Sequence, residues 1–185
     1  MNSISALVVY ESMFGNTESI AGAVADGLGL EGADVSILEV GQATPADVAQ
    51  HNLIVVGAPT HAFSLSRQAT REDAVRQGAD RARAENGLRE WLLAMKGPSD
   101  DTPRLAACFD TRVTQMRRFP KSASTRAGHL LAHNGYTLIG KPTGFVVQGT
   151  AGPLVPGEID RARSWGRVLA QVAEERLESS RSARL

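Results

Sequence analysis

The amino-acid sequence predicts an α/β protein with a parallel β-sheet between two layers of helices. Short apolar segments recur along the 185-residue chain, and longer segments with helical spacing of apolar residues separate most of them. Several short segments are apolar at every position, which is typical of strands buried on both faces of a parallel sheet. Strands that alternate with helices indicate such a sheet with both of its faces covered.

The predicted strands are apolar along most of their length. The third is the clearest, because its sequence, LIVVG, contains no polar side chain. The last is interrupted by the turn GKPTG at Gly140 to Gly144. We place strands at Ile4 to Tyr10, Val35 to Val40, Leu53 to Gly57, Leu105 to Phe109, and Tyr136 to Ile139 with Phe145 to Val147.

The predicted helices carry apolar side chains three to four positions apart. In the first helix, Ile20, Val24 and Leu28 form an apolar stripe, and Gly29 lies near the end. We place helices at Thr17 to Leu28, Asn86 to Met95, Ser122 to His133 and Pro156 to Leu177. The polar segment Ser64 to Glu85 has alternating charges and is expected to be a partly helical surface extension.

Length and composition predict one domain over residues 1–178, with a polar insertion near 64–85 and a flexible tail over 179–185. Twenty basic side chains balance twenty acidic ones, which disfavours nucleic acid as a partner. No apolar stretch is long enough for membrane insertion, and the N-terminus lacks the pattern of a signal peptide. The single cysteine, Cys108, fits a reducing compartment, so we expect a cytoplasmic protein.

Three strand-to-helix loops are expected to meet at one edge of the sheet. Right-handed crossovers bring the carboxyl ends of parallel strands to the same edge, and ligands bind there in sheets of this kind. The loops are Glu11 to Thr17, Ala58 to Arg67 and Asp110 to Lys121. The sequence therefore predicts a ligand site formed by these three loops.

The first loop has the side chains of an anion-binding turn without a cation. The hydroxyl groups of Ser12 and Thr17 and the amide of Asn16 can donate hydrogen bonds to phosphate oxygens. Gly15 allows a close turn, and the helix that follows adds unpaired N–H groups. The motifs G-x-x-x-x-G-K-[ST] and G-x-G-x-x-G are absent, which disfavours a nucleoside triphosphate or the usual dinucleotide. The same residues also fit a plain helix N-cap.

The segment VVYESMFGNTESIA, residues 8–21, resembles the flavodoxin signature: a hydrophobic strand, an aromatic and a hydroxyl residue, then T-G-N-T and a helix. Phe14 replaces the first threonine of T-G-N-T, so one hydroxyl ligand is missing. VVGAPTHAF, residues 55–63, resembles the second flavin loop of the family. GTAGPLVPGEIDRARSWGRVLA, residues 149–170, resembles the last loop and helix of actinobacterial flavodoxin-like proteins.

The resemblance implies a flavodoxin-like three-layer sandwich whose five-stranded parallel sheet has the order 2-1-3-4-5. It also implies FMN as the cofactor, with its phosphate in the first loop and its ring beside the second. The implied cofactor contacts are Ser12, Met13, Phe14, Gly15, Asn16, Thr17, Pro59, Thr60, His61, Ala62, Phe63, Phe109, Asp110, Thr111 and Arg112. Taken without the family, His61 also fits a solvated loop histidine, and Phe63 a small local core.

The third loop departs most from the family pattern. Asp110 is kept, but no tyrosine follows it, and the basic residues are Arg112, Arg117, Arg118 and Lys121. These residues fit a solvated charged loop equally well. Beside a flavin they would raise its reduction potential, or bind a nicotinamide dinucleotide phosphate or an acidic partner.

The leading hypothesis is an FMN-binding electron-transfer protein that works with a redox partner protein or a nicotinamide-dependent reductase. The first alternative is an FMN-dependent NAD(P)H:quinone-type reductase with a pocket formed by residues 64–85 and the third loop. The second is a binding module that has lost FMN, suggested by Phe14 and the missing tyrosine. No catalytic residue and no metal ligand is expected, because the chain has no nucleophile–base spacing and no metal-binding histidine pattern.

Overall fold

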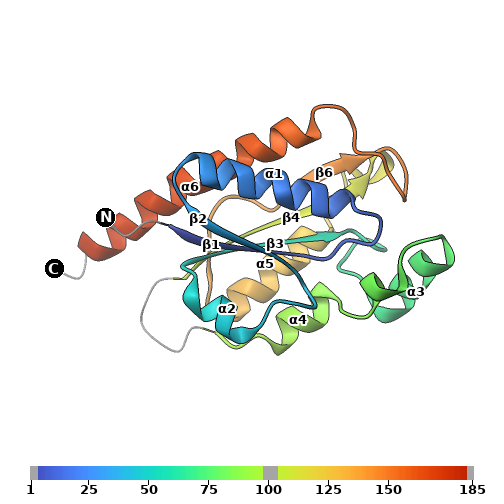
Figure 1. Cartoon of the computed structure of the whole chain (residues 1–185), viewed down its shortest axis with the longest axis horizontal. Helices are drawn as coiled ribbons and strands as arrows, with labels where there is room; N and C mark the ends of the chain where they lie inside the picture. Colours follow the sequence, from blue (N-terminus) through green and yellow to red (C-terminus); the bar gives the residue numbers. More distant parts are fainter. Residues whose placement is uncertain (1–3, 98–103, 183–185) are drawn as a thin grey trace.

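The computed structural model describes residues 4–97 and 104–182 and contains one parallel sheet in the order β2-β1-β3-β4-β5, with β6 also paired to β4 (Figure 1). Its strands are β1 (Ser5–Tyr10), β2 (Asp34–Glu39), β3 (Leu53–Pro59), β4 (Leu105–Val113), β5 (Thr137–Leu138) and β6 (Thr143–Val147). Every ladder between these strands is parallel. The predicted order 2-1-3-4-5 is confirmed.

Two short strands share the fifth position of the sheet. β5 pairs with Leu105 and Ala106, and β6 pairs with the other end of β4, from Phe109 to Val113. The predicted interruption at GKPTG separates them, and Gly140 there has a φ of 73°. A positive φ is readily adopted by glycine, so the strand breaks where the sequence allows it.

Helices cover both faces of the sheet, with α1 and α6 on one face and α2, α4 and α5 on the other (Figure 1). They are α1 (Asn16–Leu30), α2 (Pro45–Gln50), α3 (Gln68–Arg76), α4 (Leu88–Ala94), α5 (Ala123–His133) and α6 (Glu158–Ser182), with 3₁₀ turns η1 (Arg81–Ala84) and η2 (Thr114–Met116). α2 was not predicted from the sequence. It begins with a capping box in which Thr44 and Asp47 each accept the other's backbone N–H.

The central strands are buried on both faces, which explains their continuous apolar sequence. In β3, Leu53 and Val55 pack toward α1 and α6, whereas Ile54 and Val56 pack toward α4 and α5. All four side chains are fully buried. Alternate residues of one strand thus belong to two separate cores, as expected of a sheet between two helical layers.

Two predicted boundaries are wrong. β4 continues past Phe109 to Val113, so the third loop begins at η2 rather than at Asp110. The extension forms because β6 supplies hydrogen-bond partners that the local sequence of β4 does not reveal. α6 continues past Leu177 to Ser182, so positions 179–182 are helical where a tail was expected, and positions 183–185 lie outside the described residues.

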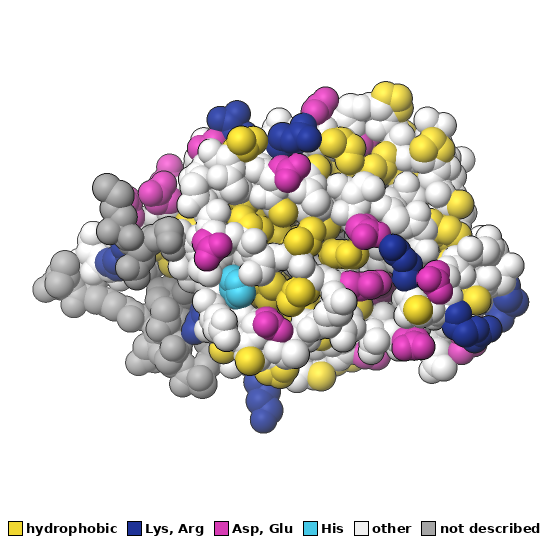
Figure 2. Space-filling model, in the orientation of Figure 1, with side chains coloured by type: hydrophobic (Ala, Val, Ile, Leu, Met, Phe, Trp, Pro, Cys, Tyr) yellow, Lys and Arg dark blue, Asp and Glu magenta, His cyan; other side chains and the backbone are white. Residues whose placement is uncertain are grey.

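The polar segment over residues 64–85, called the insertion below, is partly helical, as predicted. It contains α3 and η1 and lies at the end of the sheet where the strands finish (Figure 1). Figure 2 shows acidic and basic side chains intermingled over this region, which fits a solvated surface. Within residues 4–97 and 104–182, no helix is both long and apolar enough to cross a membrane.

Candidate functional site

A cavity of about 400 Å³ lies at the carboxyl ends of β1, β3 and β4, within the size range of ligand pockets. The predicted site residues that line it are Ser12, Met13, Phe14, Asn16, Thr17, Pro59, Thr60, His61, Ala62, Phe63, Thr111 and Arg112. Residues not predicted from the sequence complete the wall: Thr70, Ala74, Gln77, Val113, Met116, Val147 and Thr150. The described lining contains no carboxylate.

Three predicted site residues do not line this cavity. Phe109 is buried in an edge-to-face cluster with Phe145 and Trp165 on the α1 and α6 side of the sheet. Asp110 is fully buried within β4. Gly15 forms the N-cap of α1 with a φ of 85°, a conformation that favours glycine, so it shapes the first loop from behind.

The first loop leaves backbone donors at the start of α1. The hydroxyl oxygen of Ser12 accepts hydrogen bonds from the N–H groups of Gly15 at 3.1 Å and Glu18 at 3.3 Å. Within the described residues, the N–H groups of Asn16 and Thr17 have no acceptor. Unpaired N–H groups and the positive end of the helix dipole favour an anion at this position.

Side chains of the first loop also connect it to the neighbouring segments of the cavity. The hydroxyl groups of Thr17 and Thr111 are hydrogen-bonded at 2.8 Å. The Asn16 amide donates to the Ala151 carbonyl at 3.1 Å, and a Cβ atom on Gly152 would lie 2.6 Å from its Oδ1. One amide hydrogen of Asn16 is therefore engaged by the last loop, and the other is still available to a ligand.

The second loop is a tight turn with a strained backbone. His61 and Ser64 exchange backbone hydrogen bonds at 2.9 and 3.0 Å, and Ala62 and Phe63 between them have φ values of 45° and 64°. Turns of this type usually carry asparagine and glycine at these positions. Positive φ costs about 1 kcal/mol or more for other residues and is concentrated at functional sites. The turn leaves the Phe63 ring 45% exposed.

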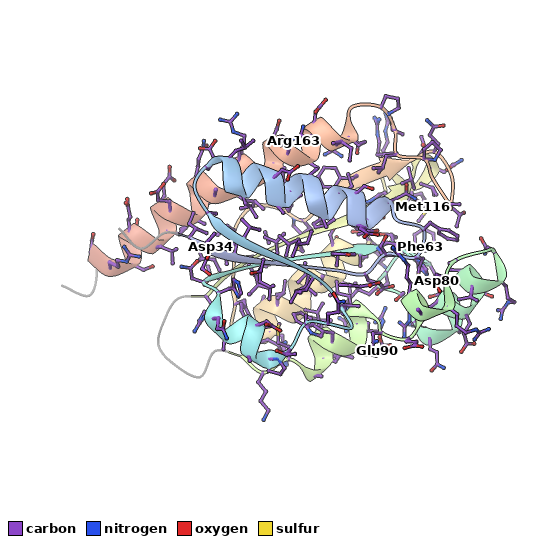
Figure 3. All side chains as sticks on the ribbon, viewed as in Figure 1. Asp34, Phe63, Asp80, Glu90, Met116 and Arg163 are labelled. Atoms are coloured by element: carbon purple, nitrogen blue, oxygen red, sulfur yellow. The ribbon has the colours of Figure 1, made fainter. Side chains whose placement is uncertain are left out.

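The two flat side chains of the second loop have different environments. Burial lowers the pKa of His61, and the charge of Arg71 lowers it further, so the imidazole is neutral at neutral pH. The Phe63 ring contacts the ring of Phe119, with centroids 5.3 Å apart. Figure 3 places Phe63 close to Met116 at the end of the sheet. His61 and Phe63 thus present flat surfaces to the cavity from one turn.

Asp110 and Arg112 form a buried ion pair beneath the cavity wall. Two nitrogens of Arg112 each lie 2.6 Å from an oxygen of Asp110. Asp110 also accepts hydrogen bonds from the N–H and the hydroxyl of Ser124 in the first turn of α5, at 3.0 and 2.5 Å. The charge of Arg112 is therefore compensated within the protein, and the uncompensated basic residues of the third loop lie further along the chain.

The insertion is packed onto the first loop. Met13, Ala74 and Ala79 form a small buried cluster, and Phe14 packs against it. Arg83 donates to the Ser12 carbonyl at 3.3 Å, and another of its nitrogens lies 2.7 Å from Glu18. Phe14 thus fills a hydrophobic contact at the position where the family signature has a threonine.

A buried arginine joins the insertion to α4. Arg71 is only 3% exposed and donates to the Ser66 hydroxyl, the Ala84 carbonyl and Glu90. This linkage holds α3 so that Thr70, Ala74 and Gln77 line the cavity. Their spacing puts them on one side of α3. The sequence predicted a surface extension here, with a pocket only under the reductase alternative, and did not single out these three residues, because their role depends on contacts with distant segments.

Glu11, at the end of β1, points away from the cavity. Its side chain is 1% exposed, and Oε2 accepts a hydrogen bond from the N–H of Leu88 at 2.8 Å. The other oxygen, Oε1, has no hydrogen-bond partner within the described residues. Burial raises the pKa of this carboxyl group, against smaller opposing effects of Ser66, Leu88 and Arg71. Glu11 thus caps the start of α4 and does not line the cavity.

Comparison with known proteins supports this fold. The flavodoxin family model matches residues 8–97. A flavodoxin from the domain Archaea has a TM-score of 0.65 at 16% identity over 92% of this chain and 99% of that chain. Flavodoxin 2 from Bacillus cereus gives 0.62 at 20% identity, over 93% of this chain and 99% of that one. A WrbA-like protein from Agrobacterium tumefaciens has a TM-score of 0.60 at 19% identity, over 94% of this chain and 99% of that chain. No curated protein matches the sequence.

Proposed function

We propose that this chain binds FMN in the cavity and transfers electrons, because the flavodoxin family model matches residues 8–97 and solved flavodoxins share its fold. The observation that carries the proposal is the cavity itself, which three loops of β1, β3 and β4 form together. FMN, when bound, would supply the redox chemistry, and the protein would bind it, orient it and limit its contact with water. No side chain need act as an acid or a base.

The first loop suits a phosphate held by neutral donors. The free N–H groups of Asn16 and Thr17 are at the start of the 15-residue helix α1, and the described lining contains no carboxylate to repel an anion. The Ser12 hydroxyl already accepts two N–H groups, so its own hydrogen is available to donate. These neutral donors could bind a phosphate although the first loop contains no lysine or arginine.

The remainder of the cavity suits a flat ring. One wall is apolar and consists of Val113, Met116 and Val147, and His61 and Phe63 add planar side chains. The polar edge of such a ring would find the side chains of Thr60 and Gln77 in the same lining. Burial keeps His61 neutral, so this wall carries no added charge at neutral pH.

We propose an electron carrier whose partner is a redox protein or a nicotinamide-dependent reductase. A cytoplasmic location and the absence of a nucleic-acid partner stay predictions from the sequence. An FMN-dependent reductase of quinone-type acceptors is the second candidate, because the insertion contributes Thr70, Ala74 and Gln77 to one side of the cavity. Steady NADPH consumption with a quinone would select the reductase over the carrier.

The test is the visible absorption spectrum of the purified protein, before and after addition of FMN and desalting. We expect the flavin absorption bands to stay with the protein after desalting. We also expect the Thr17→Val variant to bind FMN about tenfold more weakly, because it loses one hydrogen bond. Ser179→Ala, on the exposed end of α6, is the matched control and should bind as the wild type does. A folded protein that retains no flavin would reject both redox functions and favour a binding module.

A further inference from the structure

Basic residues are concentrated in one part of this neutral chain. Between Thr111 and Gly157 the sequence contains no aspartate or glutamate, and its basic residues are Arg112, Arg117, Arg118, Lys121, Arg126 and Lys141. Because the whole chain has no net charge, this segment is strongly positive and the remainder is negative. The asymmetry lies in the chain segment that includes the third loop and α5.

Four of these basic residues form an exposed group beside the cavity, called the cationic rim below: Arg117, Arg118, Lys121 and Arg126. Across residues 4–97 and 104–182, none of the four forms an ion pair. Arg112 differs, since Asp110 neutralises it. These four side chains are therefore exposed without a close ion-pair partner, although the charge of Arg117 acts on Glu158 and lowers its pKa.

Two exposed aromatic rings lie in the same region. Phe63 is 45% exposed and Phe119 is 49% exposed, and their rings contact each other. Phe119 lies between Arg118 and Lys121 in the sequence, and Phe63 lines the cavity. The strained turn holds Phe63 in place on one side of the pair. An aromatic pair at the edge of the cavity thus lies beside basic residues that form no ion pair.

A groove of about 480 Å³ extends this surface on the other side of Phe63, with Lys121, Arg126 and His129 in its lining. Positive charge continues beyond it. The pKa of Arg89 is lowered by burial and by the charges of Arg67 and Arg126. No acidic side chain lines the described groove, so the charged side chains of its lining, Lys121 and Arg126, are both basic.

We propose that the Phe63–Phe119 pair and the cationic rim dock an acidic redox protein at the mouth of the cavity. Exposed aromatic residues with a charged periphery are the usual composition of a protein interface, where the aromatic residues anchor and the charges steer. The rim runs from the end of η2 to the second turn of α5, and Arg117 and Arg118 lie outside the lining of the groove. This extent favours a protein over a small anion. The docking role rests on the proposed electron transfer, but binding itself does not require FMN.

The test is an NMR titration of the ¹⁵N-labelled chain, with and without FMN, against an acidic plant-type [2Fe–2S] ferredoxin at low ionic strength. We expect signal changes concentrated at Phe63, Phe119 and the cationic rim. The double variant Arg117→Glu, Arg118→Glu should weaken binding about tenfold or more, and about 0.5 M salt should abolish it. Phe119→Ala should weaken binding several-fold while leaving the cavity intact.

The matched control is Arg176→Glu, Arg181→Glu, which makes the same change in net charge on the exposed end of α6. An equal loss of affinity in the control would overturn the proposal, because net charge alone would then explain binding. Changes at another surface, or binding of basic cytochrome c in place of the ferredoxin, would also reject it. Signal changes at Lys121 and Arg126 with NADPH alone would assign a nucleotide site instead.

The experiment separates this proposal from the proposed function. If the chain retains no FMN but binds the ferredoxin at the rim, the docking surface is supported and the electron-transfer function fails. If FMN is retained and the ferredoxin does not bind at the rim, the docking proposal fails and the cofactor proposal stands.

Discussion

The hydroxyl oxygens of Thr17 and Thr111 lie 2.8 Å apart, joining the first turn of α1 to the carboxyl end of β4. Both side chains are buried and both line the cavity. Since Thr17 belongs to the first loop and Thr111 to the carboxyl end of β4, their hydrogen bond sets the distance between these two walls of the cavity.

Thr111→Val should lower the free energy of unfolding by about 1–3 kcal/mol, because it leaves the buried Thr17 hydroxyl without a partner. Urea denaturation of the FMN-free protein measures this. The double variant Thr17→Val, Thr111→Val should lose less than the sum of the single variants, since neither hydroxyl is then left unpaired. Strictly additive losses would show that the two hydroxyls do not interact.

Arg112→Met should destabilise the protein by about 3–5 kcal/mol, since it leaves the buried Asp110 carboxylate without its cation. Chemical denaturation again provides the measurement. Arg163→Met is the control, because its ion pair with Asp160 is exposed and should contribute about 0–1 kcal/mol. If the two variants lose equal stability, the Asp110–Arg112 pair is not the structural element that its burial indicates.

Glu11 should make stability depend on pH. Burial raises the pKa of Glu11 in the folded state above the ordinary value of 4.5. The contribution of Glu11 to folding stability is therefore complete below pH 4.5 and is lost as the pH rises through the raised pKa. Glu11→Gln keeps the shape and removes the charge. At neutral pH the variant should therefore unfold at higher urea concentration than the wild type, and the difference should narrow toward pH 4.5. A difference that grows on acidification would contradict this assignment.

Phe14→Thr restores the hydroxyl of the family signature but removes a ring that packs on the insertion. We expect a loss of about 1–3 kcal/mol in stability, by the usual cost of removing partly buried apolar atoms. Faster trypsin cleavage within residues 64–85 would locate the effect. Phe14→Leu keeps most of the packing and serves as the control. Unchanged cleavage in Phe14→Thr would mean that Phe14 does not hold the insertion.

Ala62→Gly should stabilise the second loop. Ala62 has a φ of 45°, which glycine adopts without strain, so the free energy of unfolding should rise by about 0.5–1 kcal/mol. Thermal unfolding measures the change. The same substitution in a helix, Ala49→Gly in α2, should have the opposite sign. A loss of stability in Ala62→Gly would show that this turn is not strained.

The fold class and the location of the site could be predicted from the sequence because both depend on local patterns. Apolar runs such as Leu53 to Gly57 identify buried strands, and their alternation with helices requires a parallel sheet. Parallel connections then place Ser12 to Thr17 beside Pro59 to Phe63 at one edge. These steps need only residues that are near one another in the chain and the constant hand of the connections.

Only the tertiary structure decided what the residues after Phe109 do. β6 extends β4 and so places Asp110 inside the sheet, where it pairs with Arg112 and caps α5. Contacts with the first loop and α4 bring α3 to the cavity, and Phe63 meets Phe119 across the gap between two loops. Each of these features is a contact between segments far apart in the sequence. The local sequence pattern of one segment therefore cannot predict it.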